Sequence, residues 1–207
     1  MPARLPLFAA ALALPSAAAL PPVFADAQST APAALDQRVA ELASGFCIDV
    51  LSRSVTLPEP GDAETALFAR YGIQPGMPDA ALTALGRQGT SLISNATLAS
   101  GTATDGAFAI ALGGAAGPSC RIIVYKAPTS RLVVRSSWEK MASPAFAWKA
   151  LPPPPQPPAM LRLMAAKRRP GGSPYLATLI APMAPGEIAM IVSVAAIPPN
   201  VTLPQGF

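Results

Sequence analysis

The chain has 207 residues, of which 51% are hydrophobic and 13% are charged, and its formal net charge is +4. A sequence this apolar and this weakly charged can bury a core, which excludes an intrinsically disordered protein. Because the sequence contains no histidine, Ser-His-Asp and Cys-His catalytic centres and histidine-ligated zinc are excluded as well.

The N-terminal segment has the pattern of a secretory signal peptide. Arg4 supplies a positive charge, and residues 5–25 contain no charged side chain. Small residues stand at the two positions that signal peptidase reads, both for cleavage after Ala25 and for cleavage after Ala27. The pattern favours the second site and leaves the first open.

We therefore predict that residues 1–27 are a removed signal peptide and that residues 28–207 fold as a single domain in the periplasm or outside the cell. A mature part of roughly 180 residues suffices for one core and is short for two domains. The alternative is an uncleaved N-terminal anchor, for which the alanines and prolines are poorly suited. After signal removal, no transmembrane segment is expected.

Two cysteines, Cys47 and Cys120, belong to the predicted mature part. An exported protein folds where disulfides persist, so we predict that these two pair. Two buried free thiols are the alternative. No metal site is expected, because two isolated cysteines without histidine cannot complete a tetrahedral zinc centre.

A strong amphipathic helix is predicted over residues 35–51. Its apolar side chains recur at spacings that gather them in one stripe, and its polar side chains take the other face. Cys47 belongs to the stripe, so its sulfur is expected to point into the core. The stripe consists of Leu35, Val39, Leu42, Ala43, Phe46, Cys47, Val50 and Leu51.

Two shorter helices are predicted next. Asp62 caps the first of them, and Gly72 ends it. The second begins at Pro78 and ends at Gly86 or Gly89.

The pattern then changes toward strands. Residues 90–103 fit either a helix or a strand, and weak alternation favours the strand. Beyond them the period is two, and the Asp105-Gly106 dipeptide favours a tight hairpin turn. A hairpin is therefore predicted near residues 107–126.

The C-terminal part contains four more segments. Residues 130–142 fit a helix or a strand, and residues 152–158, with six prolines, predict an extended connector. A short helix is predicted over residues 160–168, followed by a second hairpin near residues 175–197.

Together these elements predict an α+β fold. Helices come first and hairpins follow, without regular strand-helix alternation, which is typical of an antiparallel sheet with a helical layer. We expect about four to five strands, packed on the N-terminal amphipathic helices.

One short motif suggests catalysis. Ser137 and Lys140 have the spacing of the Ser-x-x-Lys motif of penicillin-binding proteins and serine β-lactamases, in which the lysine acts as base for the serine. The later motifs of those enzymes are missing downstream of Lys140. The competing interpretation is therefore a solvated helix face beside a buried Trp138.

The charges are unevenly distributed along the chain. Residues 36–79 contain seven acidic and three basic side chains, whereas the chain from residue 80 onward contains three acidic and eleven basic ones. The basic half is a candidate for binding an anionic partner, and the competing interpretation is that the two halves offset each other within one fold. The candidate anion-binding residues are Arg121, Lys126, Arg131, Arg135, Lys167, Arg168 and Arg169.

Two functions are therefore expected, from different classes. The first is a non-enzymatic binding or accessory module of the cell envelope, whose partner is an anionic envelope component or an acidic protein and not nucleic acid. The alternative is a histidine-independent serine hydrolase that uses Ser137 and Lys140. No cofactor is expected, because the sequence has no phosphate-binding glycine loop.

Overall fold

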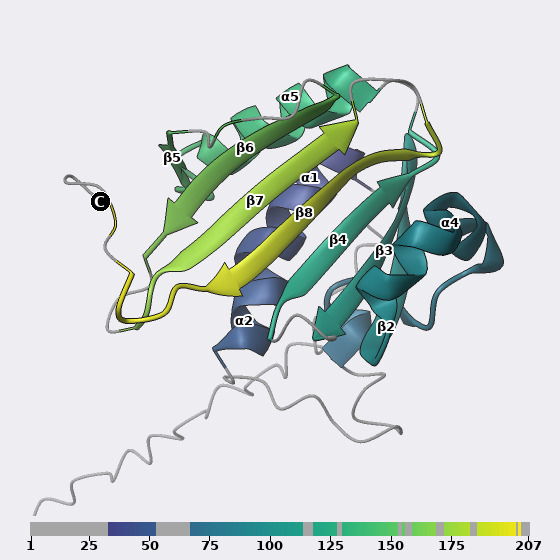
Figure 1. Ribbon diagram of the computed structural model, residues 1–207, viewed down its shortest axis with the longest axis horizontal. Coiled ribbons are helices and arrows are strands. Elements are labelled where there is room, and N and C mark those ends of the chain that lie inside the picture. The colour runs from purple at the N-terminus through teal and green to yellow at the C-terminus, as the bar shows by residue number, and fades with distance from the viewer. Residues whose placement is uncertain are drawn as a thin grey trace, which may run out of the picture. The chain divides into compact units, whose positions relative to one another are not determined.

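Figure 1 shows the computed structural model of the chain. It describes residues 33–52, 67–113, 118–127, 130–152, 155, 159–168, 172–182, 186–201 and 203, with side chains left out at residues 87–92, 130 and 131. The predicted signal peptide and the Asp62 cap lie outside the described residues.

An eight-stranded antiparallel sheet forms the centre of the described fold, with strand order β1-β2-β3-β4-β8-β7-β6-β5. The strands are β1 (Gln74–Pro75), β2 (Ala96–Ala103), β3 (Gly106–Gly113), β4 (Cys120–Tyr125), β5 (Lys149–Leu151), β6 (Met160–Lys167), β7 (Tyr175–Pro182) and β8 (Ile188–Ala196). The α+β class and both predicted hairpins are confirmed.

The expected count of four to five strands is wrong, because β1 and β5 are too short to give a pattern and the residues of β6 predict a helix. Residues 160–168 are rich in leucine, methionine and alanine, which favour helices. Their alternation places Leu163 and Ala165 in the core, and pairing along the whole length of β7 fixes the strand.

The N-terminal helical segment consists of α1 (Leu35–Glu41), a π-helical turn η1 (Leu42–Phe46) and α2 (Cys47–Leu51). The predicted apolar stripe is confirmed up to Cys47, since its residues there are buried. The π turn was not predicted. Within it, the hydroxyl of Ser44 accepts a hydrogen bond of 2.8 Å from the indole of Trp148, which ties the helix to the segment after α5.

Residues 67–70 are helical, and the helix ends before Gly72, as predicted. Two longer helices are α4 (Asp79–Ile93) and α5 (Ser130–Ala142). Helix α4 passes both glycines predicted to end it, and Gly86, with φ of 59°, marks a kink inside it. The preferred strand over residues 90–103 is therefore correct only from Ala96 onward. Residues 130–142, for which the sequence left both states open, form a helix.

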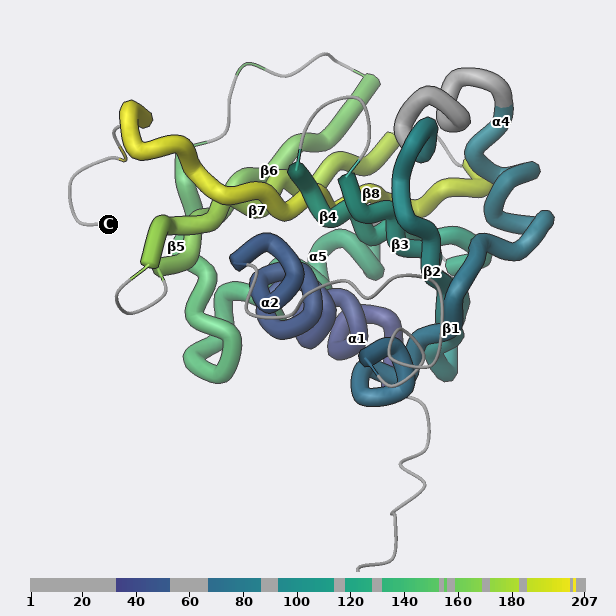
Figure 2. Tube along the Cα trace, turned by 90° about the horizontal axis from the view of Figure 1, so that it is seen from below, coloured from purple at the N-terminus to yellow at the C-terminus, as the bar shows by residue number. Residues whose placement is uncertain are grey.

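Helices cover the two faces of the sheet unequally. We call the face covered by α1, η1, α2 and α5 the inner face, and the opposite face the outer face. Helix α4 lies on the outer face, over β2 and β3 (Figures 1 and 2). The largest buried side chains of the inner core include Leu35, Leu42, Phe46, Phe68, Phe108, Ile110, Ile122, Met141, Leu179 and Met190.

A disulfide joins Cys47 at the start of α2 to Cys120 in β4, as the sequence predicts. The two alpha carbons are 5.4 Å apart, and both residues are fully buried. The bond therefore crosses the inner core and connects the N-terminal helix to a central strand.

Reducing this bond should lower the stability of the fold. The cysteines are 73 residues apart, and closing a loop of that length stabilises a folded chain by roughly 4 kcal/mol through the lost entropy of the unfolded state. Urea unfolding with and without reductant measures the difference. Equal midpoints for the oxidised and reduced protein would contradict this prediction.

The turn between β2 and β3 holds the beginning of α1. The backbone N–H of Leu35 donates a hydrogen bond of 2.7 Å to Oδ1 of Asp105 in this turn. A side chain at the next residue, Gly106, would place its Cβ 2.5 Å from Leu35 and 3.1 Å from the carbonyl oxygen of Lys126. A larger residue here would therefore displace the Leu35 side chain, and the hairpin turn caps a helix far away in the sequence.

Replacing Asp105 tests this remote cap. Asp105→Ala should lower the free energy of unfolding by about 1 kcal/mol, because a helix N–H loses its acceptor. Asp105→Asn keeps an oxygen acceptor and serves as the matched control. If urea unfolding shows the same loss for both variants, the cap is not the cause.

The sheet consists of two halves with the same order of elements. Each half has a helix on the inner face, then a short edge strand, then three antiparallel strands: β1 and β2–β4 in the first half, β5 and β6–β8 in the second. The β2–β3 and β6–β7 ladders each contain eight residue pairs. The sequence shows no repeat, because matching positions carry unlike residues.

Candidate functional site: an apolar cavity on the outer face

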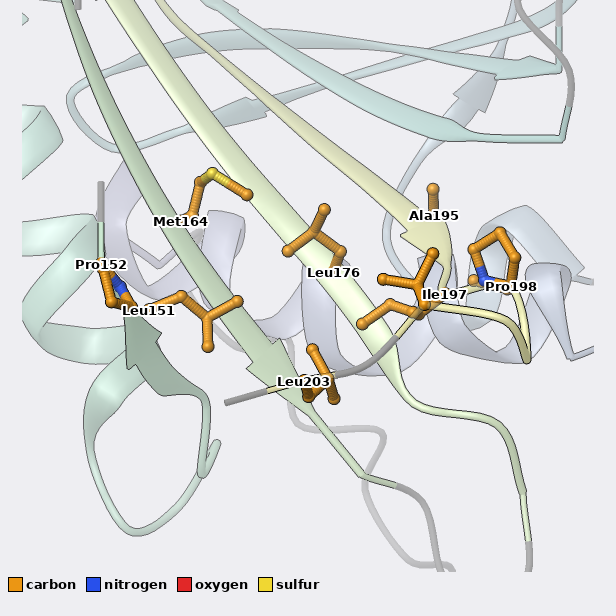
Figure 3. A pocket seen from close by; sticks show the side chains of 10 residues that line it. Leu151, Pro152, Met164, Leu176, Ala195, Ile197, Pro198 and Leu203 are labelled. Atoms are coloured by element: carbon orange, nitrogen blue, oxygen red, sulfur yellow. The ribbon is translucent and has the colours of Figure 1, made fainter. Parts of the chain in front are cut away.

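A cavity of about 550 Å³ lies on the outer face of the second half of the sheet (Figure 3). Its volume is within the range typical of small-molecule sites. The lining residues are Leu151, Pro152, Met164, Leu176, Ala195, Ala196, Ile197, Pro198, Val201 and Leu203.

Strand alternation determines which side chains form the floor of the cavity. Met164 in β6, Leu176 in β7 and Ala195 in β8 point away from the inner core, because their chain neighbours Ala165, Ala177 and Val194 are buried in it. Leu176 and Ala195 are direct partners across the β7–β8 ladder. The floor therefore combines apolar side chains from three adjacent strands.

The walls of the cavity come from segments that flank the sheet. Leu151 and Pro152 belong to the edge strand β5 and the residue after it, whereas Leu203 lies on the C-terminal tail (Figure 3). The tail is anchored where it leaves β8, since Ile197 is buried and its N–H donates a hydrogen bond of 2.8 Å to the carbonyl of Pro174.

The lining chemistry determines what the cavity can do. All ten lining residues have apolar side chains, so they supply no acid, base, nucleophile or metal ligand. Such a surface binds by the burial of apolar area, which contributes about 25 cal/mol for each Å² removed from water.

Ser137 and Lys140 lie away from this cavity, on α5 at the inner face. Ser137 is fully buried, and its hydroxyl has no hydrogen-bond partner among the described residues. Lys140 is partly exposed. A nucleophile must be reachable by a substrate, and the cavity opens on the other side of the sheet.

Arg121 and Arg135, two of the candidate anion-binding residues, lie on opposite sides of the sheet. Arg121 is buried in β4 on the outer side, and its Nη1 donates a hydrogen bond of 3.0 Å to the carbonyl of Gly113. Arg135 is exposed on α5 and forms an ion pair of 2.8 Å with Glu139. The structure therefore does not bring these two cations together.

The remaining candidates lie near chain turns. Lys126 is exposed directly after β4, and Arg168 is exposed directly after β6. The ammonium group of Lys167 donates a hydrogen bond of 2.6 Å to the carbonyl of Phe146, and burial lowers its pKa. The side chain of Arg131 and the whole of Arg169 lie outside the described residues.

The described part of the chain shows neither a metal centre nor a membrane-spanning helix. It contains no cluster of three or more histidine, cysteine or acidic residues that could hold a metal ion. None of its helices is both long and apolar enough to span a bilayer.

Sequence reasoning missed the cavity. Its residues come from five segments, and the sequence predicts a helix where Met164 lies in a strand. The sequence signal for this strand is the alternation in residues 160–167, where Arg162 and Met164 point away from Leu161, Leu163 and Ala165.

The chain matches no protein-family model, and neither a similar curated protein nor a similar solved structure was found.

The burial of Ser137 predicts that a fluorescent fluorophosphonate, which reacts with accessible activated serines, does not label the folded protein. Ser137→Ala should leave stability unchanged or raise it by about 1 kcal/mol, because it removes a buried hydroxyl without a partner. Gel fluorescence and urea unfolding measure the two effects. Labelling of the native protein that disappears in Ser137→Ala would instead support the hydrolase hypothesis.

Proposed function

We propose that this protein is a non-enzymatic binding module of an exported compartment, periplasmic or secreted, and that the outer-face cavity is its binding site. The observation that carries the proposal is the cavity itself, whose lining consists entirely of apolar side chains. Its ligand inserts an apolar group. The anionic partner expected from the charge distribution remains a separate prediction, because none of the candidate anion-binding residues lines the cavity.

The proposed compartment is supported by two independent features. The N-terminal segment has the pattern of a signal peptide, and the buried disulfide suits an oxidising environment.

The cavity is large enough for useful affinity. Burying one leucine-sized group contributes about 1.5–3 kcal/mol, and association costs at least about 4 kcal/mol in lost freedom of motion. Several apolar groups must therefore enter together, and a volume of about 550 Å³ accommodates them.

Binding of the amphipathic fluorophore 1-anilinonaphthalene-8-sulfonate, whose aromatic rings favour apolar surfaces, tests the site. Its fluorescence should rise with the native protein, and Leu176→Asp should weaken binding by about tenfold, or about 1.4 kcal/mol, because a charge then occupies the floor. Leu132→Asp is the matched control: Leu132 is 67% exposed on α5, so binding should not change.

A second variant covers the case in which Leu176→Asp disturbs the fold. Ala195→Phe keeps the floor apolar and fills the cavity, so it should also weaken binding of the fluorophore. Circular dichroism verifies the fold of each variant. If both variants fold and bind the fluorophore as the native protein does, the cavity is not the binding site.

A further inference from the structure

The two halves of the sheet can be compared position by position, because their ladders have the same length. The second residue of β3 is Ala107, paired with Tyr125 of β4; the second residue of β7 is Leu176, paired with Ala195 of β8. The cavity floor in the second half therefore occupies the positions of Ala107 and Tyr125 in the first half.

The edge strands extend this correspondence. The fifth residue of β2, Ser100, pairs with Gln74 of β1, and the fifth residue of β6, Met164, pairs with Leu151 of β5. Pro75 follows Gln74 just as Pro152 follows Leu151. Five cavity residues thus have counterparts at matched sheet positions.

In the first half, a helix covers these positions. Helix α4 packs on Ala107 and Tyr125 in the outer core. Apolar residues of the outer core recur here at the spacing of one helix face, in the N-terminal part of α4 and just before it. They are Met77, Ala80, Ala81, Ala84 and Leu85. Figures 1 and 2 show α4 on this side of the sheet.

The second half has no room in its sequence for such a helix. Helix α4 is inserted between β1 and β2, whereas β5 and β6 are separated only by residues 152–159, with six prolines among residues 152–158. Proline lacks the N–H that a helix interior requires. Where α4 lies in the first half, the second half has the cavity.

We propose that the cavity docks an amphipathic helix of a partner protein, at the place that corresponds to α4. This inference rests on the proposed function and names the class of ligand. An apolar helix face laid in a groove is a common mode of recognition. The first half of this sheet accepts one on a surface with the same strand register.

The side chains also indicate which anchors the partner needs. Tyr125 fills the first half where the second has Ala195, while Leu176 replaces the smaller Ala107. The hollow therefore lies over Ala195, and the partner helix places a large aliphatic or aromatic side chain there. Over Leu176 it places a small one.

A pair of synthetic peptides tests the inference. The first contains residues 77–93 with Gly86→Ala, to allow an unbroken helix, and with Ala84→Leu, to supply a large anchor. The second has the same composition in scrambled order. We expect the first peptide to displace the naphthalene fluorophore at about tenfold lower concentration than the second and to gain helical circular dichroism when it binds. Ala195→Tyr in the protein should abolish this advantage, and Leu132→Asp should keep it.

Other outcomes would contradict helix docking. Equal displacement by both peptides, or displacement without gain of helicity, overturns helix docking. If dodecanoate displaces the fluorophore and neither peptide does, the cavity accepts acyl chains, so the proposed function stands and this inference is wrong. If the fluorophore itself does not bind at the cavity, the proposed function fails as well.

Discussion

The fold depends on a central sheet that is apolar on its inner face and carries apolar patches on its outer face. In β7 and β8 the inward residues Ala177, Leu179, Val192 and Val194 belong to the inner core, while Leu176 and Ala195 point outward and are apolar too. A face of this kind must be covered, because exposed apolar area is unfavourable in water. Helix α4 covers the outer face in the first half, and the C-terminal tail borders an apolar cavity in the second.

The inner face provides the rigid support that such a site needs. The Cys47–Cys120 bond connects the N-terminal helical segment to β4, and a hydrogen bond from Leu35 to Asp105 holds the beginning of that segment. Because β4 is paired to β8, these contacts reach the strand that carries Ala195. A binding surface on paired strands keeps its geometry better than one on loops.

The sequence predicts the parts of the fold that depend on local pattern. The apolar stripe through Cys47 and the two hairpins are clear because burial there follows a regular period. The strand at residues 160–167 was missed because helix-forming residues occupy it, and only its pairing with β7 decides its state. The cavity could not be predicted, since it brings Leu151 and Leu203 together with three strands, and no local pattern encodes that proximity.

The most direct test of the account observes the two faces of the sheet separately. Met164 lies in the cavity, whereas Met190, on β8, is fully buried in the inner core. Methyl NMR of the methionines during titration with the naphthalene fluorophore therefore reports where binding occurs. Binding in the cavity predicts that the Met164 methyl signal shifts and that of Met190 stays in place. A Met190 shift without a Met164 shift would contradict it.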